Sequence, residues 1–187
     1  KEKRILLETL ESEGLLRNLL FETGSLLENS ILQALEILGL KAERFNEGES
    51  EFDAVFTWEG HRFLGEAEGK DTKAINVDKI SQLERNLSED FSRDEVDTYA
   101  KGILFGNACR LKPLSERGEY FTEKCISTAK RLKVALVRTP DLFVIAKHLK
   151  ESPNADYAKR CIESIFYTEG AIVSFPSPPE IKIAPSV

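Results

Sequence analysis

The chain has 187 residues, of which 41% are hydrophobic and 31% charged, a balance typical of a globular domain with its own hydrophobic core. The sequence contains no apolar run of the roughly 18 to 20 residues that cross a bilayer and no secretory leader, which excludes a membrane protein and predicts a cytoplasmic one. The net charge of −6 excludes a uniformly basic surface of the kind that binds nucleic acid non-specifically.

The first predicted element is a helix over residues 1–21, where leucines recur at helical spacing. We interpret residues 1–23 as a linker from an upstream domain or as a dimer contact, which leaves a homodimer open. The chain begins at Lys1 and contains no methionine, so we expect it to be part of a longer protein with an additional N-terminal domain.

A second helix is predicted from Ser25 to Leu38, with Gly39 as its stop. Ser25 is the expected N-cap, and Glu28 stands three residues later, at the capping-box position. Glu28 is therefore a candidate capping residue.

Three strands follow, at residues 41–46, Glu51–Trp58 and His61–Gly69. The last two are joined by Glu59-Gly60, a two-residue turn typical of an antiparallel hairpin. The second half then alternates helices with buried strands, a pattern that indicates parallel pairing. The predicted elements there are helix Asn76–Phe91, strand Lys101–Asn107, helix Glu119–Leu132, strand Val134–Arg138, and helices Pro140–Lys150 and Asn154–Phe166.

The element order predicts an α/β fold with a mixed β-sheet flanked by helices. We place this domain at residues 24–172 and expect residues 173–187, which contain four prolines, to form an extended tail. The three cysteines are odd in number and widely spaced, which fits neither a disulfide framework nor a zinc site. They are expected to be small core residues in a reducing compartment.

The segment from Glu51 to Lys70 carries the chemistry. Side chains two apart in a strand point the same way, so Glu66, Glu68 and Lys70 are expected on one face. Asp53 interrupts an apolar run on the neighbouring strand. For any one of these residues a solvated, salt-bridged surface is the simpler explanation, but together they favour a site.

Asp53 and Glu68 offer the oxygen ligands that Mg²⁺ or Mn²⁺ takes in proteins. Lys70 beside that cation would orient or help to deprotonate an attacking water, or neutralise charge at a phosphate. Glu66 is an additional carboxylate, and the metal ligand could be Glu66, Glu68 or both.

Asp53, fourteen intervening residues and then Glu68-Gly69-Lys70, across a hairpin that follows a helix, resemble the PD-(D/E)xK nuclease superfamily. The resemblance covers residues 24–150 and implies a restriction-endonuclease-like αβββαβ core, here with extra N- and C-terminal helices. It also implies that Asp53, Glu68 and Lys70 are catalytic. Phe52 stands where many members have proline.

The resemblance implies two further site residues. Glu28 stands where many members add an acidic metal ligand from the helix before the strands, beside Asp53 and Glu68, and the sequence does not choose between this role and the capping one. Gln82 stands where several members carry a catalytic polar residue on the helix after the lysine. In this sequence Gln82 shares the polar face of that helix with Lys79 and Asn86.

The function this predicts is a metal-dependent endonuclease that hydrolyses DNA phosphodiester bonds with a metal-activated water, in a bacterial protein of the restriction or defence type. A catalytically inactive restriction-like module that binds nucleic acid or protein is the main alternative. A glycosidase that uses Glu66 and Glu68 is disfavoured, because carboxylates two apart on one strand do not flank a sugar bond from two sides.

The charge is unevenly distributed, with 7 basic and 15 acidic side chains in residues 1–69 but 9 basic and 3 acidic ones in residues 101–138. A basic segment of this kind can meet phosphate. The weaker nucleic-acid-binding candidates, for which a solvated loop is the alternative, are Lys79, Asn107, Arg110, Lys112 and Arg117.

Overall fold

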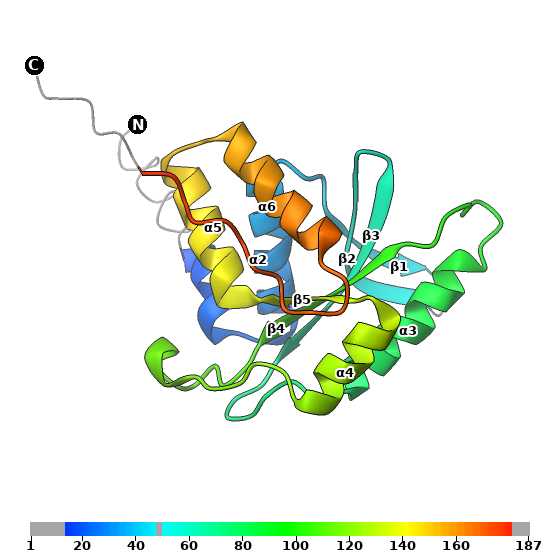
Figure 1. Ribbon diagram of the computed structural model, residues 1–187, viewed down its shortest axis with the longest axis horizontal. Coiled ribbons are helices and arrows are strands. Elements are labelled where there is room, and N and C mark those ends of the chain that lie inside the picture. Colours follow the sequence, from blue (N-terminus) through cyan, green and yellow to red (C-terminus); the bar gives the residue numbers. More distant parts are fainter. Residues whose placement is uncertain (1–13, 48–49, 181–187) are drawn as a thin grey trace, which may run out of the picture.

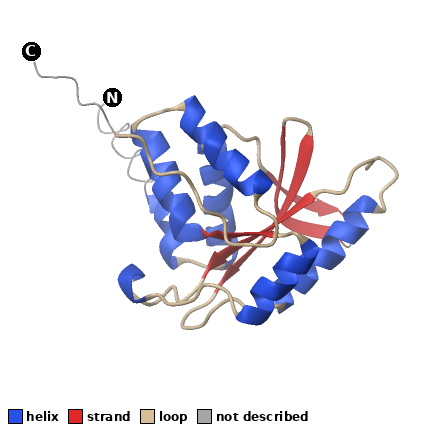
Figure 2. Cartoon of the chain, viewed as in Figure 1, coloured by secondary structure: helices blue, strands red, loops and turns tan. Residues whose placement is uncertain are grey.

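A computed structural model describes residues 14–47 and 50–180 of the chain. In this part, five strands form one sheet in the order β1-β2-β3-β4-β5, with helices against both of its faces (Figures 1 and 2). The pairs β1–β2 and β2–β3 are antiparallel, and β3–β4 and β4–β5 are parallel. The predicted α/β class, with a mixed sheet flanked by helices, is confirmed.

The order of the elements is also the predicted one. The strands are β1 (Glu43–Glu47), β2 (Ser50–Trp58), β3 (His61–Gly69), β4 (Lys101–Asn107) and β5 (Ala135–Arg138). The helices are α2 (Gly24–Ile37), α3 (Asp78–Phe91), α4 (Glu123–Leu132), α5 (Thr139–Glu151) and α6 (Ala155–Tyr167), with a short 3-10 turn at Leu114–Glu116. Glu59 and Gly60 have positive φ angles of 47° and 81°, as the predicted tight turn of the β2–β3 hairpin requires.

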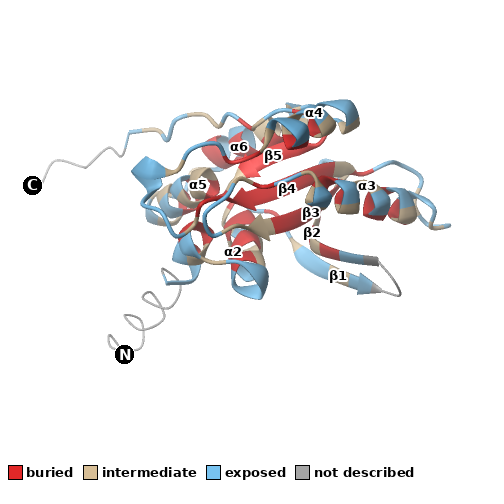
Figure 3. Ribbon diagram, turned by 90° about the horizontal axis from the view of Figure 1, so that it is seen from below, coloured by how far each residue is buried: buried red, intermediate tan, exposed pale blue. Residues whose placement is uncertain are grey.

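Two hydrophobic cores lie on opposite faces of the sheet. One packs α2, α5 and α6 against residues such as Phe63 and Ala67 of β3, and the other packs α3 and α4 against residues such as Leu64. The central strands are therefore covered on both sides, whereas β1 lies largely exposed at the edge of the sheet (Figure 3). This layering explains why β4 is a continuous apolar run.

The predicted start of α4 at residue 119 is wrong. The helix begins at Glu123, and the side chain of Thr122 caps it by accepting a hydrogen bond from the Cys125 backbone N–H (3.2 Å). Phe121 is buried and forms an isolated parallel bridge with Ile75, so the chain is extended just before the helix. Phe121 is apolar because it pairs with Ile75 as a strand residue would, and helical periodicity does not reveal such a contact.

Ser25 is not the N-cap of α2, and that prediction is wrong as well. The helix begins at Gly24, whose φ of +56° turns the chain, and Thr23 occupies the cap position without a side-chain hydrogen bond. Ser25 therefore lies inside the first helical turn. Glu28 follows the cap residue Thr23 by five positions instead of the three of a capping box, which removes the capping role from its two candidate roles. Its carboxylate makes a salt bridge to Arg44 of β1 (2.7 Å).

Both ends of the described chain pack onto the domain. Residues 14–21 are helical, Leu16 and Leu19 are buried in the core, and Thr139 donates a hydrogen bond to the Leu19 carbonyl (2.6 Å). Residues 14–21 thus pack against the domain, while residues 1–13 of the predicted first helix lie outside the described residues. At the other end, Val173 is buried and its backbone N–H bonds to the Leu136 carbonyl of β5 (2.8 Å).

The remaining expectations from composition concern the cysteines and the membrane. Cys109, Cys125 and Cys161 are buried free thiols, as predicted. Across residues 14–47 and 50–180, every helix is too short or too polar to span a bilayer.

Candidate active site

The predicted catalytic residues lie where the C-terminal half of β3 faces the N-terminal half of β2. The ladder between these strands pairs residues from Trp58↔His61 to Ala54↔Gly65. Beyond that pair, the Ala67 backbone N–H donates to Oδ2 of Asp53 (2.8 Å). A side-chain carboxylate thus takes a hydrogen bond from the β3 backbone and ties Asp53 to the strand that carries Glu68.

A bulge in β2 gives Asp53 this orientation. Phe45 of β1 pairs with Phe52, and Glu43 pairs with Val55, so β2 has one residue more than β1 in this interval. Phe52 and Val55 both pack in the core on the α3 side, with Asp53 and Ala54 between them. Bulges of this kind re-aim a side chain beside a site, and here they break the alternation that would otherwise fix its face.

Glu66 is the most buried carboxylate of the group, with only 1% of its surface exposed. Its Oε1 accepts a hydrogen bond from Nδ2 of Asn86 (2.9 Å), and its Oε2 accepts from Nζ of Lys79 and Nε2 of Gln82 (3.2 Å each). All three donors come from α3. The predicted polar face of this helix is confirmed, and the structure shows that it holds Glu66.

Glu68 and Lys70 form an ion pair at the end of β3, with Nζ 2.5 Å from Oε1. Steric contact explains why residue 69, between them, is glycine. A Cβ there would lie 2.6 Å from Cβ of Thr23 and 3.0 Å from the Glu22 carbonyl oxygen. The chain segment that leads into α2 therefore passes directly behind the motif. Only glycine permits that approach.

The charges of these residues act on one another. Burial raises the pKa of Asp53, although the Ala67 N–H bond opposes it. Burial, followed by the negative charge of Asp53, raises the pKa of Glu66 to about 7. Burial, again followed by the Asp53 charge, raises the pKa of Glu28. Carboxylates from α2, β2 and β3 thus form one electrostatic group around Asp53.

Lys79 is the cation inside this group. Burial by itself lowers the pKa of Lys79, but the carboxylates of Glu66, Asp53 and Glu68 together raise it above its ordinary value. Its Nζ lies 3.2 Å from Oε2 of Glu66 and 3.9 Å from Oε2 of Glu68. The sequence placed Lys79 among the weaker nucleic-acid-binding candidates, and only the position of α3 shows its contact with the carboxylates.

The chemistry of these donors fits a hard divalent cation. Residues 14–47 and 50–180 contain no ready-made group of three or more His, Cys, Asp or Glu arranged around one ion. Mg²⁺ does not require one, because it is usually held by one or two carboxylates and keeps water or phosphate oxygens for the rest. Asp53 and Glu68, with Glu28 nearby, are the candidate ligands, whereas Glu66 is already bonded through both oxygens to α3.

Three of the predicted phosphate-contacting residues already have partners at the end of the helix formed by residues 14–21. Arg117 donates to the Leu20 carbonyl (2.6 Å), Arg110 to the Phe21 carbonyl (2.6 Å) and Asn107 to the Glu22 carbonyl (2.8 Å). Their positive and polar groups thus satisfy the free carbonyls of a helix C-terminus. Lys112 is exposed in the same loop, and its contact with phosphate stays a prediction.

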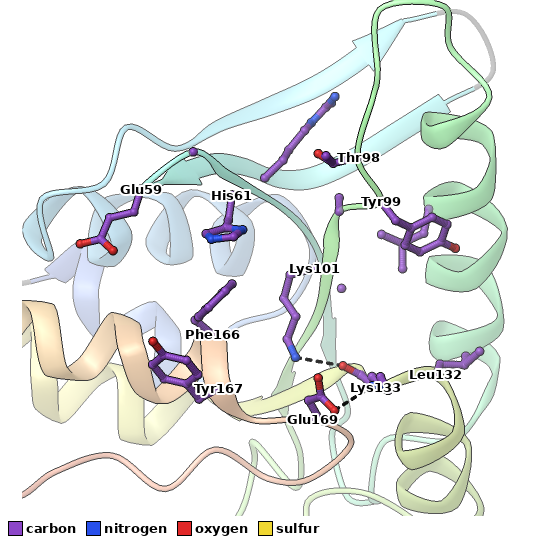
Figure 4. Close-up of a pocket in the computed structure, with 15 residues that line it drawn as sticks. Glu59, His61, Thr98, Tyr99, Lys101, Leu132, Lys133, Phe166, Tyr167 and Glu169 are labelled. Carbon is purple, nitrogen blue, oxygen red and sulfur yellow. Dashed lines mark hydrogen bonds and ion pairs between the residues drawn. The ribbon is translucent and has the colours of Figure 1, made fainter.

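A separate cavity of about 540 Å³ lies at the opposite end of the sheet, beside the starts of β3 and β4 (Figure 4). Lys101 lies within it and donates hydrogen bonds to the carbonyls of Lys133 and Thr168, at the ends of α4 and α6. Burial lowers the pKa of Lys101. None of the predicted site residues lines this cavity.

The fold is similar to that of a known restriction endonuclease. The solved structure of restriction endonuclease FokI matches 86% of this chain and 30% of its own with a TM-score of 0.59, at 11% sequence identity. FokI bound to DNA matches 89% of this chain and 30% of its own, with a TM-score of 0.57 and 11% identity. The chain thus spans less than a third of the length of these proteins.

Sequence comparison adds nothing to this likeness. No protein-family model and no curated protein matches the chain. At 11% identity the structural match establishes the fold alone: a mixed five-stranded sheet with helices on both faces, of the restriction-endonuclease-like kind. The predicted fold is thereby confirmed, and the chemistry of Asp53, Glu68 and Lys70 stays a prediction.

Proposed function

We propose that this chain is a metal-dependent nuclease that hydrolyses phosphodiester bonds of DNA. The observation that carries the proposal is the joining of β2 to β3 through the Asp53 carboxylate, beside the Glu68–Lys70 ion pair. The likeness to FokI, one of whose solved structures holds DNA, supports DNA as the substrate and a restriction or defence role.

In the proposed reaction, a water gives up one proton and its oxygen attacks the phosphorus, the bond from phosphorus to one ester oxygen breaks, and the leaving oxygen takes up a proton. A divalent cation held by Asp53 and Glu68 would supply Lewis acidity and lower the pKa of the attacking water. Lys70, partly exposed beside Glu68, orients that water, helps to deprotonate it, or neutralises charge at the phosphate. The α3 residues fix Glu66, and so hold this part of β3 in place.

A plasmid-cleavage assay tests the proposal. The chain should nick supercoiled DNA with Mg²⁺ or Mn²⁺ and not with EDTA. Lys70→Ala should lower the rate at least about 100-fold, since a positioned proton-transfer group contributes about 10² to 10⁴. Lys124→Ala, which removes an exposed lysine of α4, is the matched control and should cleave normally. Normal cleavage by Lys70→Ala would refute the assignment.

A second candidate function, an inactive module that binds nucleic acid or protein, is favoured by one observation. The carboxylates already have cationic partners within the chain: Arg44 for Glu28, Lys70 for Glu68 and Lys79 for Glu66. Calorimetric titration with Mn²⁺ separates the two functions. The nuclease should bind the metal and lose that binding in Asp53→Ala, whereas an inactive module should show no binding in either protein.

A further inference from the structure

Lys79 holds an unusual position in the candidate active site. It enters from α3, whereas the acidic side chains come from α2, β2 and β3. Its Nζ lies 3.2 Å from Glu66 and 3.9 Å from Glu68, and only 24% of the side chain is exposed. Its charge also acts on Asp53 and Glu28. One ammonium group thus faces the same carboxylates that are expected to attract a metal ion.

The two contacts of Lys79 differ in kind. Glu66 is held by Asn86 and Gln82 as well, so the Lys79–Glu66 contact belongs to a fixed hydrogen-bonded group. Glu68 is more exposed, has a separate partner in Lys70, and lies at the longer distance from Lys79. The contact with Glu68 can therefore be given up while the contact with Glu66 remains.

We propose that Lys79 is a positioning residue that fills the cation position of this site before a divalent ion binds, and that the ion displaces its ammonium from Glu68. The inference rests on the metal site of the proposed function. The Lys79 ammonium group and a divalent ion repel each other strongly at such distances in a partly dehydrated site. Lys79 therefore sets how tightly the metal binds, and in the metal-free protein its positive charge offsets the negative charges of Glu66, Asp53 and Glu68.

Calorimetric titration of Mn²⁺ into the full chain tests this inference without any cleavage assay. Lys79→Met keeps most of the side-chain volume and removes the charge, so it should bind Mn²⁺ about tenfold more tightly. Lys79→Arg keeps the charge and should stay within about twofold of the unmodified chain. Lys70→Met is the matched control. Its gain should be smaller because Lys70 is 39% exposed, so that water screens its charge more than that of Lys79.

Unchanged or weaker Mn²⁺ binding by Lys79→Met overturns the inference. An equal gain in Mn²⁺ affinity in Lys70→Met overturns it too, because the loss of any nearby positive charge would then explain both results. Crystal structures of the unmodified chain with and without Mn²⁺ give a test that needs no variant. The Lys79–Glu68 distance should lengthen while the Lys79–Glu66 contact stays, and an unmoved Lys79 would contradict the displacement. Tighter Mn²⁺ binding in Lys79→Met without any cleavage by the unmodified chain would refute only the nuclease function.

Discussion

Two lysines at opposite ends of the sheet, Lys79 and Lys101, are both partly buried, yet the pKa of the first is raised and that of the second is lowered. Burial lowers the pKa of each. Lys79 faces the full charges of Glu66, Asp53 and Glu68, whereas Lys101 bonds to two helix-end carbonyls. Carbonyl dipoles satisfy an ammonium group without fully compensating its charge, while carboxylates do both.

This difference supports the proposed position of the active site. The end of the sheet with Lys79 concentrates acidic groups whose charges conflict, which is the condition under which a divalent cation is attracted. The end with Lys101 has a cavity, but its lysine joins the C-terminal ends of α4 and α6. We therefore expect substitutions at the first end to change activity and those at the second to change stability.

The largest expected effect is on cleavage, from Asp53→Asn. The amide loses the negative charge that would hold a cation but keeps an oxygen to accept the Ala67 N–H bond. We expect the cleavage rate to fall by at least about 100-fold, because a bound metal ion supplies several kcal/mol of transition-state stabilisation, while the circular dichroism spectrum and the melting temperature change little. A plasmid assay measures the rate, and cleavage at the normal rate would show that Asp53 of β2 is not part of the active site.

Glu66→Gln should change the pH dependence of stability. The folded-state pKa of Glu66 is about 7 against an ordinary 4.5, so the folded protein keeps this proton at a pH where the unfolded chain has lost it. The stability that this proton contributes is therefore present below pH 4.5 and is lost as the pH rises through 7. Relative to Glu66→Gln, the unmodified chain should lose about 3 kcal/mol between these limits.

Denaturant unfolding of both proteins across this pH range measures the difference. Glu84→Gln on the exposed part of α3 is the control, and its curve should run parallel to that of the unmodified chain. Parallel curves for Glu66→Gln as well would show that burial and the Asp53 charge do not raise the pKa of Glu66.

Lys101→Met tests the opposite end of the sheet. The carbonyls of Lys133 and Thr168 lose their donor, so we expect a loss of about 1 to 3 kcal/mol in the free energy of unfolding. The cleavage rate below the melting temperature should not change. A large loss of cleavage by the folded variant would show that the two ends of the sheet do not divide activity and stability as proposed.

The smallest effect is expected for Tyr167→Ala, at the rim of the same cavity. This side chain is 72% exposed, so its removal should change the free energy of unfolding by less than about 0.5 kcal/mol. Cleavage and Mn²⁺ affinity should both be unchanged. An altered Mn²⁺ affinity would indicate that this cavity communicates with the carboxylates at the other end.

Much of the fold could be predicted from local pattern. The strand Lys101–Asn107 is found at its predicted residues because a strand buried on both faces must be continuously apolar. The polar face of α3 could also be predicted, because helical periodicity sets Lys79, Gln82 and Asn86 apart from the apolar stripe. That this face contacts Glu66 could not be predicted, because the position of α3 along β3 depends on how the two elements pack.

The wrong predictions share one cause. Ser25 and residues 119–122 have the local features of a helix start and of a helix, but contacts with distant segments decide their conformation. Phe121 bridges to Ile75, and Thr23, which takes the cap position in place of Ser25, lies against Gly69 of β3. A local propensity of a fraction of a kcal/mol per residue is easily outweighed by the burial of one aromatic ring.

The sequence by itself determined the order of helices and strands, the mixed sheet and the motif of Asp53, Glu68 and Lys70, because these depend on periodicity and spacing along one chain. Only the tertiary structure decided that Asp53 bonds to the β3 backbone, that α3 holds Glu66, and that Lys79 lies among the carboxylates. Those contacts join residues 13 to 20 positions apart through a bulge and a helix–sheet interface. Such geometry is set by packing, which no local pattern encodes.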